Sequence, residues 1–210
     1  MRETVRRLLA GHGQTYAQQA GIRLADRPGP LYQLLVLSVL LSTRIRADIA
    51  VGAARELFAA GFDTARDMRQ ADWQDVVDAL GRGHYVRYDE STATALNEGA
   101  GVILDRYRGD LRRMREQAGG DVAALERLLQ QVPRLGPAGA AIFCREAQAV
   151  WPELRPYLDR KTLDGARRLD LPTDPDALAS LVSADELAPL AAALVRVALD
   201  KHLARQIAAA

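Results

Sequence analysis

The chain lacks the alternation of apolar and polar residues that marks β-strands. No segment shows sustained two-residue alternation with β-branched residues, and aromatic residues make up only 5% of the sequence. Alanine and leucine dominate instead, and both favour helices. The sequence therefore predicts an all-α fold. The expected helices cover residues 2–20, 31–42, 47–60, 64–69, 73–80, 89–107, 110–117, 122–131, 138–149, 160–168, 175–182 and 186–207.

Residues that commonly begin and end helices flank many of these segments. Aspartate and threonine side chains accept hydrogen bonds from the unpaired N–H groups of a first helical turn. Glycine adopts the left-handed conformation that often follows the last turn. We expect N-caps at Asp63, Asp72, Asp121 and Thr173, and helix ends at Gly61, Gly109 and Gly119.

Composition limits the class of protein further. The 210 residues are 49% hydrophobic and 26% charged, which is typical of a globular chain with a substantial core. The net charge is only +1, so any nucleic-acid surface must be a local basic patch. The single cysteine, Cys144, excludes a disulfide framework within the chain and fits a cytoplasmic location. We expect no signal peptide and no membrane span, because the longest strongly apolar run covers only residues 34–41.

A glycine- and proline-rich turn precedes the alanine-rich helix expected over residues 138–149. Pro133 ends the preceding amphipathic pattern because proline has no N–H for a continuing helix. Gly136 permits close backbone approach or a positive φ, and Pro137 suits the first position of a helix. The unpaired N–H groups of that first turn, with the helix dipole, form a possible phosphate site. The same pattern also occurs in plain connectors between helices.

A carboxylate opens the next helix. Trp151 and Pro152 interrupt the chain, and Asp159 then precedes the basic pair Arg160 and Lys161. An aspartate in this position is ordinarily an N-cap worth about 1 kcal/mol. Asp159 is therefore a candidate catalytic residue whose simplest alternative role is structural.

The turn, and the distance from it to Asp159, resemble a motif of the helix-hairpin-helix (HhH-GPD) DNA glycosylase superfamily. The resemblance is to the endonuclease III-like branch of that superfamily. That family has a hairpin of the form LPGVGxxTA, followed about twenty residues later by Val-Asp at a helix start. The matching segments here are residues 132–140 and Leu158-Asp159. Residues 31–42 also resemble the buried helix that opens the family core, and Gly83-His84-Tyr85 resembles its GLYNxKA segment. The resemblance covers roughly residues 25–205.

The resemblance implies a single HhH-GPD unit over residues 1–210 with two helical lobes and DNA between them. The lobe with the hairpin would comprise about residues 31–143, and the second lobe residues 1–30 plus 144–210. It also implies a monomer that binds double-stranded DNA containing a damaged base, in the cytoplasm at the nucleoid and without membrane association.

The resemblance assigns roles to individual residues. Asp159 would be the catalytic carboxylate. The residues expected to bind DNA are Arg134, Leu135, Gly136, Ala138, Gly139, Arg44, Arg46, Arg160 and Lys161. Tyr32, Trp151 and Tyr157 are weaker candidates for stacking against the flipped base, since aromatic residues near helix ends more often belong to the core. The hairpin carbonyls could hold a structural monovalent cation.

Three departures from the family pattern refine the expected activity. Bifunctional members carry a nucleophilic lysine where this chain has Ala138, so a glycosylase here would leave an intact abasic site. Many relatives bind an iron–sulfur cluster through four cysteines, whereas this sequence has one, so we expect no cluster. Arg160 and Lys161 follow Asp159 where classical endonuclease III has Thr-His. A basic residue after the aspartate resembles the sequence of the cluster-free 3-methyladenine glycosylases. The histidines and Cys144 lack metal-ligand spacing, so we expect no metal site.

The preferred hypothesis is therefore a monofunctional glycosylase in which Asp159 stabilises a cationic sugar, with alkylated purines as the favoured bases. Such a base must leave the duplex stack to reach the site. A glycosylase for oxidised or deaminated bases is an alternative. A non-catalytic helix-hairpin-helix DNA-binding protein and an all-helical interaction module are further alternatives.

Overall fold

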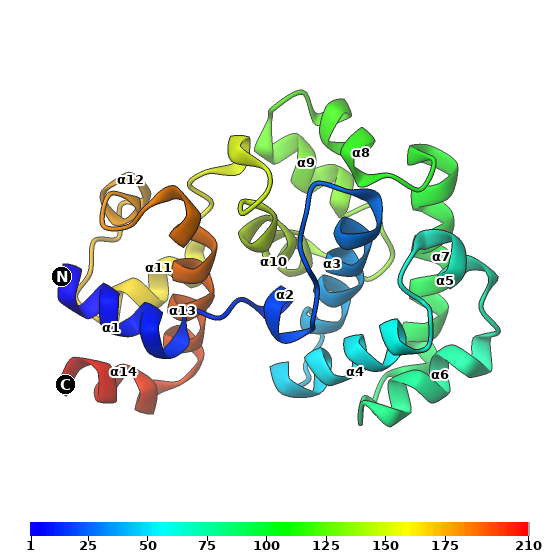
Figure 1. Ribbon diagram of the computed structural model, residues 1–210, viewed down its shortest axis with the longest axis horizontal. Coiled ribbons are helices and arrows are strands. Elements are labelled where there is room, and N and C mark those ends of the chain that lie inside the picture. The colour runs from blue at the N-terminus through cyan, green and yellow to red at the C-terminus, as the bar shows by residue number, and fades with distance from the viewer. Residues whose placement is uncertain (210) are drawn as a thin grey trace. The chain divides into compact units, whose positions relative to one another are not determined.

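The computed structural model describes residues 1–209, and this part of the chain is helical without β-strands (Figure 1). The all-α prediction is confirmed. None of the described helices has the length and apolar character needed to cross a membrane. The helices are α1 (Arg2–His12), α2 (Tyr16–Gln19), α3 (Pro28–Leu41), α4 (Ala47–Ala59), α5 (Ala65–Gln70), α6 (Trp73–Arg82), α7 (Asp89–Tyr107), α8 (Leu111–Ala118), α9 (Val122–Leu129), α10 (Pro137–Ala147), α11 (Arg160–Arg167), α12 (Pro175–Ala179), α13 (Leu187–Leu199) and α14 (Lys201–Ala209), with 3₁₀ turns η1 (Pro152–Leu154) and η2 (Ala184–Glu186).

Two predicted helices are each divided in the structure. The helix expected over residues 2–20 ends at His12, where the N–H of Gly13 donates to the carbonyl of Leu9, and α2 begins at Tyr16. The helix expected over residues 186–207 is interrupted at Asp200, which has an extended conformation. The Asp200 carboxylate accepts the N–H of His202 at 2.8 Å, so this residue begins a new helix instead of continuing the old one.

The helix caps agree with the sequence prediction at most positions. In the structure, the side chains that cap α5, α6, α9 and α12 are those of Thr64, Asp72, Asp121 and Asp174. The predicted caps Asp63 and Thr173 are therefore each wrong by one residue, because the following side chain accepts the helix N–H. All three predicted glycine stops have positive φ values and lie at helix ends.

The chain forms two compact units. One contains Met1–Tyr16 and Cys144–Ala210, and the other contains Ala17–Phe143. Residues 17–30, assigned to the second lobe from the sequence, belong instead to the unit with the hairpin. The reason is local packing: Ala20 and Ile22 are buried, and Arg55 of α4 donates to the carbonyl of Gln19 at 2.7 Å.

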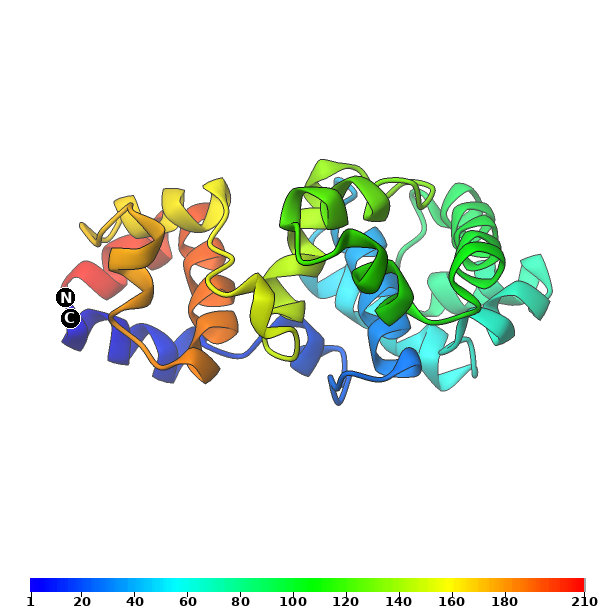
Figure 2. The ribbon, with the colours of Figure 1, turned by 90° about the horizontal axis from the view of Figure 1, so that it is seen from above.

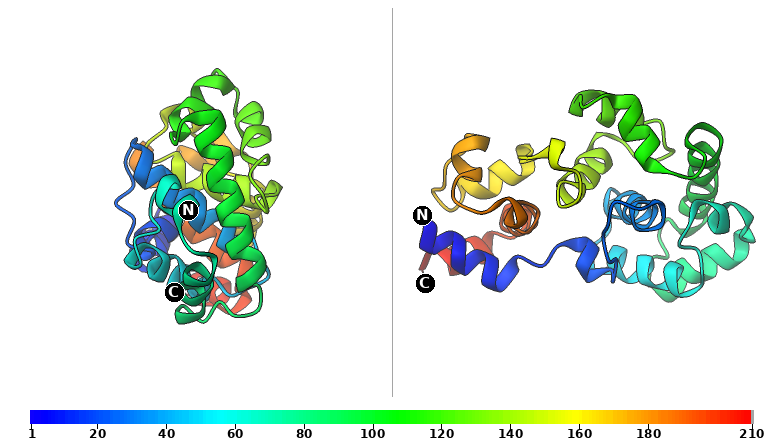
Figure 3. Two further views of the ribbon diagram at one scale, coloured as in Figure 1. Left: turned by 90° about the vertical axis from the view of Figure 1, so that its right-hand side faces the viewer. Right: turned by 45° about the horizontal axis from the view of Figure 1, so that its top comes forward.

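The unit formed by Ala17–Phe143 is built around α3. Nine of its residues between Leu31 and Leu40 are buried, which explains the unbroken apolar run in the sequence. The one hydroxyl in this run, Ser38, donates to the carbonyl of Leu34 at 2.8 Å and so avoids an unpaired buried group. Helix α3 packs against α4, α7 and α8. Figure 3 draws these helices from two further sides.

The other unit is built around α13, which packs against α1, α11 and α14 (Figure 2). Its core combines leucine and alanine side chains from α1, α11, α12, α13 and α14. Helix α11 lies very close to α13 at Gly165, where an added Cβ would be 1.9 Å from the carbonyl oxygen of Leu194. This close contact fixes α11, and with it the residue that caps its N-terminus.

Candidate functional site

Asp159 is the N-cap of α11, and both of its carboxylate oxygens accept hydrogen bonds. Oδ1 accepts the N–H of Thr162 at 3.1 Å and the Thr162 hydroxyl at 2.7 Å. Oδ2 accepts from Nη1 of Arg145 at 2.7 Å. A carboxylate offers about four lone-pair positions, so one position on Oδ2 is left. The Asp159 side chain is 17% exposed and therefore still within reach of a ligand.

The irregular segment before Asp159 is held by a buried glutamine that follows α10. Gln148 Nε2 donates to the carbonyls of Arg145 and Tyr157 at 2.9 and 3.1 Å. Gln148 Oε1 accepts the N–H of Tyr157 at 3.0 Å. The Arg155 guanidinium also donates to the Gln148 carbonyl at 2.7 Å. These bonds fix the backbone two residues before Asp159, so the carboxylate is positioned from both sides.

Arg145 is the main site residue that the sequence analysis missed. It lies on α10, and its side chain is only 10% exposed. The only signal in the sequence is the charged pair Arg145-Glu146 within an otherwise apolar helix. Charged side chains are rarely buried without a partner, so the pair itself indicates a buried ionic interaction.

The hairpin before α10 differs in detail from its predicted geometry. Gly136 is not among the residues with positive φ, whereas Arg134 has a φ of 62°. The close approach occurs at Gly139, where an added Cβ would be 2.7 Å from Cδ1 of Leu135. Leu135 and Gly139 are buried and so present little surface to DNA, while Gly136, Pro137 and Ala138 are exposed. The start of α10 therefore presents an open backbone surface.

Hydrogen bonds connect the hairpin to two neighbouring loops of the same unit. Arg134 Nη1 donates to the Ser91 hydroxyl at 2.6 Å, and the Arg134 guanidinium lies 5.8 Å from the centre of the Tyr88 ring. The Arg134 carbonyl accepts from the Ser42 hydroxyl at 3.4 Å. The Thr43 and Tyr85 hydroxyls are 2.7 Å apart. The loops around residues 42–46, 84–88 and 133–136 therefore form one surface.

The remaining predicted DNA-binding residues are all solvent-exposed. Arg44 and Arg46 lie on the loop that follows α3, and Arg46 pairs with Asp48 at 2.7 Å. Arg160 and Lys161 form the first turn of α11, directly after Asp159. Exposed cations of this kind can bind phosphates without a large desolvation cost.

The structure corrects the assignment of Tyr32 and Trp151 to a base pocket. Both side chains are buried, with relative exposures of 2% and 0%, so neither ring presents a face to a base. Burial raises the pKa of Tyr32 above its usual value. Tyr157 is partly exposed, and it is the candidate whose ring can still reach solvent.

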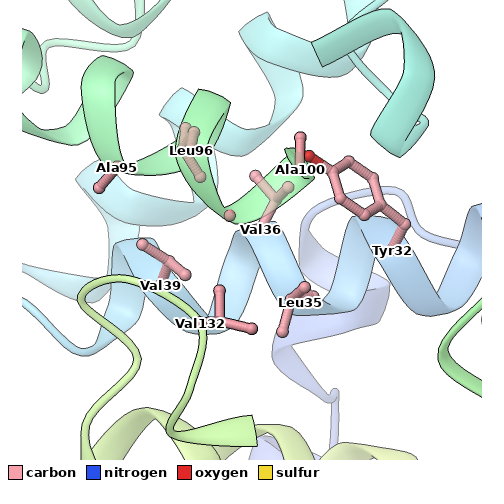
Figure 4. A pocket seen from close by; sticks show the side chains of 9 residues that line it. Tyr32, Leu35, Val36, Val39, Ala95, Leu96, Ala100 and Val132 are labelled. Atoms are coloured by element: carbon pink, nitrogen blue, oxygen red, sulfur yellow. The ribbon is translucent and has the colours of Figure 1, made fainter. Parts of the chain in front are cut away.

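A small cavity beside Tyr32 does not provide an alternative base pocket. Its volume is about 10 Å³, and apolar side chains of α3 and α7 with Val132 line it (Figure 4). This is close to the space that one water molecule needs. The cavity is therefore too small to hold a base.

Possible metal ligands do not gather at any of these positions. Within residues 1–209, no group of three or more histidine, cysteine, aspartate or glutamate side chains could hold a metal ion. Cys144 is buried on α10 and is not part of a disulfide.

The arrangement of helices defines the class of fold before any relative is considered: a two-unit, all-α protein with a helical hairpin and a capped carboxylate. A solved structure described as a trapped endonuclease III–DNA covalent intermediate, in an estranged-adenine complex, has a similar fold. The match has a TM-score of 0.50 and 13% sequence identity, and it covers 93% of this chain and 84% of that chain. No protein-family model and no curated protein sequence matches the chain. The chain therefore has an endonuclease III-like fold.

Proposed function

We propose that this chain is a monofunctional DNA glycosylase that releases damaged bases, with alkylated purines as its main substrates. The observation that carries the proposal is the placement of Asp159. A carboxylate with one free lone-pair position stands at the N-terminus of a helix, fixed by Thr162 and Arg145, on an endonuclease III-like fold. Fixed geometry is what electrostatic stabilisation of a transition state requires.

The proposed reaction breaks the bond between C1′ of the sugar and the base nitrogen. The base leaves with the electron pair of that bond, and positive charge develops on the sugar ring. Asp159 stabilises this charge. Water then adds to C1′ and loses a proton, which leaves an abasic sugar. No covalent intermediate with the chain is involved, because Ala138 offers no nucleophile at the position of the lysine in bifunctional relatives.

DNA binding in this proposal uses charges and backbone amides. The exposed start of α10 offers unpaired N–H groups to a phosphate, as helix N-termini commonly do. Arg44, Arg46, Arg160 and Lys161 would add phosphate contacts. Contacts of this kind position the duplex without reading its sequence. A monovalent cation at the hairpin carbonyls would serve the same purpose.

A second candidate is a non-catalytic DNA-binding protein. The observation in its favour is the ion pair between Asp159 and Arg145, because a buried carboxylate with a cationic partner is also a purely structural arrangement. Under this alternative the chain would bind duplex DNA with an affinity that falls as salt rises, but it would release no base.

The test is release of methylated purines from duplex DNA treated with a methylating agent, comparing the wild-type chain with Asp159→Asn. Asparagine retains the helix cap, so this variant should fold. We expect its base-release rate to fall by about 100-fold or more, since loss of the carboxylate charge leaves the Arg145 guanidinium uncompensated beside the sugar, while DNA binding persists. Asp164→Asn, which changes a partly exposed aspartate of α11 that pairs with Arg167, is the matched control and should retain full activity.

Equal activity of the wild-type chain and Asp159→Asn would contradict the role of Asp159. If neither chain releases a methylated purine, oxidised and deaminated bases are tested next. DNA binding without release of any of these bases would favour the non-catalytic candidate.

A further inference from the structure

The partner of Asp159 is a permanently charged group. Arg145 Nη1 lies 2.7 Å from Asp159 Oδ2, and the two side chains are 10% and 17% exposed. The guanidinium remains protonated at any pH at which a protein is folded. The carboxylate and its partner therefore carry no net charge together, and the low exposure reduces screening by water and salt.

Arg145 is also held in place by its own surroundings. Its carbonyl accepts from the side chain of Gln148 at 2.9 Å, and the next residue, Glu146, accepts the N–H of Tyr16 at 3.0 Å. These bonds fix this end of α10. Arg145 is thus a built-in part of the site and not a surface side chain that pairs by chance.

We infer that Arg145 sets the substrate class of the site by limiting Asp159 to bases that carry positive charge before they leave. This inference rests on the proposed glycosylase activity. An electrically compensated carboxylate stabilises a nearby cation less than an isolated carboxylate does, because the guanidinium repels the same cation. The site therefore offers limited help to a reaction that must create new charge.

Cationic and neutral bases differ in how much new charge their departure creates. A purine alkylated on a ring nitrogen, such as 7-methylguanine, is already cationic and leaves as a neutral molecule. The positive charge only moves from the base to the sugar. A neutral base such as uracil leaves as an anion unless it is protonated, so its departure separates opposite charges. That reaction depends far more on an uncompensated carboxylate or on an acid.

The side chains bonded to Asp159 supply no such acid. Arg145 does not release its proton, and Thr162 is buried with its O–H already donated to Asp159 Oδ1 at 2.7 Å. A leaving base therefore receives no proton from either of these residues. The immediate surroundings of Asp159 favour bases that need none.

Variants of Arg145 test this role through a ratio of two rates. Single-turnover release is measured for 7-methylguanine and for uracil in the same duplex. Arg145→Met and Arg145→Gln remove the charge, and we expect the ratio of the 7-methylguanine rate to the uracil rate to fall at least tenfold. A neutral base gains more from an uncompensated carboxylate because charge appears only in its transition state. Arg145→Lys retains the charge and should retain the ratio.

Thr162→Val is the matched control for positioning alone. It removes a hydrogen bond to the same carboxylate without changing any charge, so it should alter both rates by the same factor. Thermal unfolding of each variant establishes that the compared chains are folded, and the lysine variant keeps the test valid if both neutral variants unfold. In that case, a tenfold fall in the ratio of the 7-methylguanine rate to the uracil rate in Arg145→Lys would overturn the inference, and an unchanged ratio would support it.

The outcomes distinguish this inference from the proposed function. Equal loss of both rates in the folded neutral variants would show that Arg145 only holds the site, which overturns the inference and leaves the glycosylase intact. Similar wild-type rates on 7-methylguanine and uracil would also overturn it. Release of neither base, nor of any other damaged base, by the wild-type chain would refute the glycosylase proposal itself.

Discussion

Arg134 shows how one residue can hold a candidate DNA-binding surface together. It occupies a left-handed backbone conformation, which is unfavourable for a residue with a Cβ, and its side chain bonds to Ser91 and stacks near Tyr88. These contacts connect the hairpin to the start of α7. The side-chain contacts therefore offset the strain in the backbone.

Two substitutions of Arg134 separate these effects. Both Arg134→Ala and Arg134→Gly lose the side-chain contacts, but glycine also relieves the positive φ. We expect the glycine variant to be more stable than the alanine variant by about 1 kcal/mol in denaturant unfolding. Equal stabilities, or a more stable alanine variant, would argue against the left-handed conformation at this position.

At the residue scale, the sequence predicted which residues begin helices better than it predicted the contacts that those residues make. Asp159 is a helix cap as expected, but its pairing with Arg145 joins residues 14 positions apart across an irregular segment. No local pattern specifies such a contact. Similarly, glycine at position 136 suggested close backbone approach or a positive φ there, whereas the structure has the positive φ at Arg134.

At the scale of elements, the contact between α11 and α13 determines where Asp159 stands. An added Cβ at Gly165 would lie 1.9 Å from the carbonyl oxygen and 2.7 Å from the carbonyl carbon of Leu194. Backbone atoms cannot move aside as a flexible side chain can. The two helices can therefore pack this closely only with glycine at position 165.

Alanine substitutions test this packing. Gly165→Ala should destabilise the chain by more than about 3 kcal/mol, because α11 must move away from α13. Gly101→Ala is the matched control in the interior of α7, where the nearest atoms belong to the side chain of Arg69 at 3.6 Å. That variant should gain up to about 1 kcal/mol from better helix propensity. Chemical denaturation of both variants checks the difference, and a mild effect at Gly165 would contradict the close contact.

Most helices could be predicted because their apolar periodicity and caps are local signals. The breaks at Gly13 and Asp200 were missed for a physical reason. At Asp200 the flanking residues favour a helix, and the interruption comes from a side-chain cap that competes with one more helical turn. At Gly13 the prediction gave too little weight to Gly11 and Gly13, which are poor helix formers. The unit boundary near residue 17 depends on packing between distant segments, which periodicity does not encode.

At the scale of the whole molecule, the fold and the proposed chemistry draw on both units. The unit of Ala17–Phe143 carries the hairpin and its basic loops, and the other unit carries Asp159 and Arg145. Because the net charge is only +1, the proposed binding of duplex DNA relies on these local groups and not on overall charge. The fold alone does not establish a reaction, because function depends on the residues of a site.

The most direct test of the central claim counts released bases and strand breaks in one reaction. The chain is incubated with end-labelled, methylated duplex DNA, and free methylated purines are measured alongside breaks before and after alkali treatment. We predict that bases are released and that matching breaks appear only after alkali, since Ala138 leaves the abasic strand intact. Breaks without alkali would contradict the monofunctional mechanism, and absence of any released base would contradict the assignment of methylated purines as substrates.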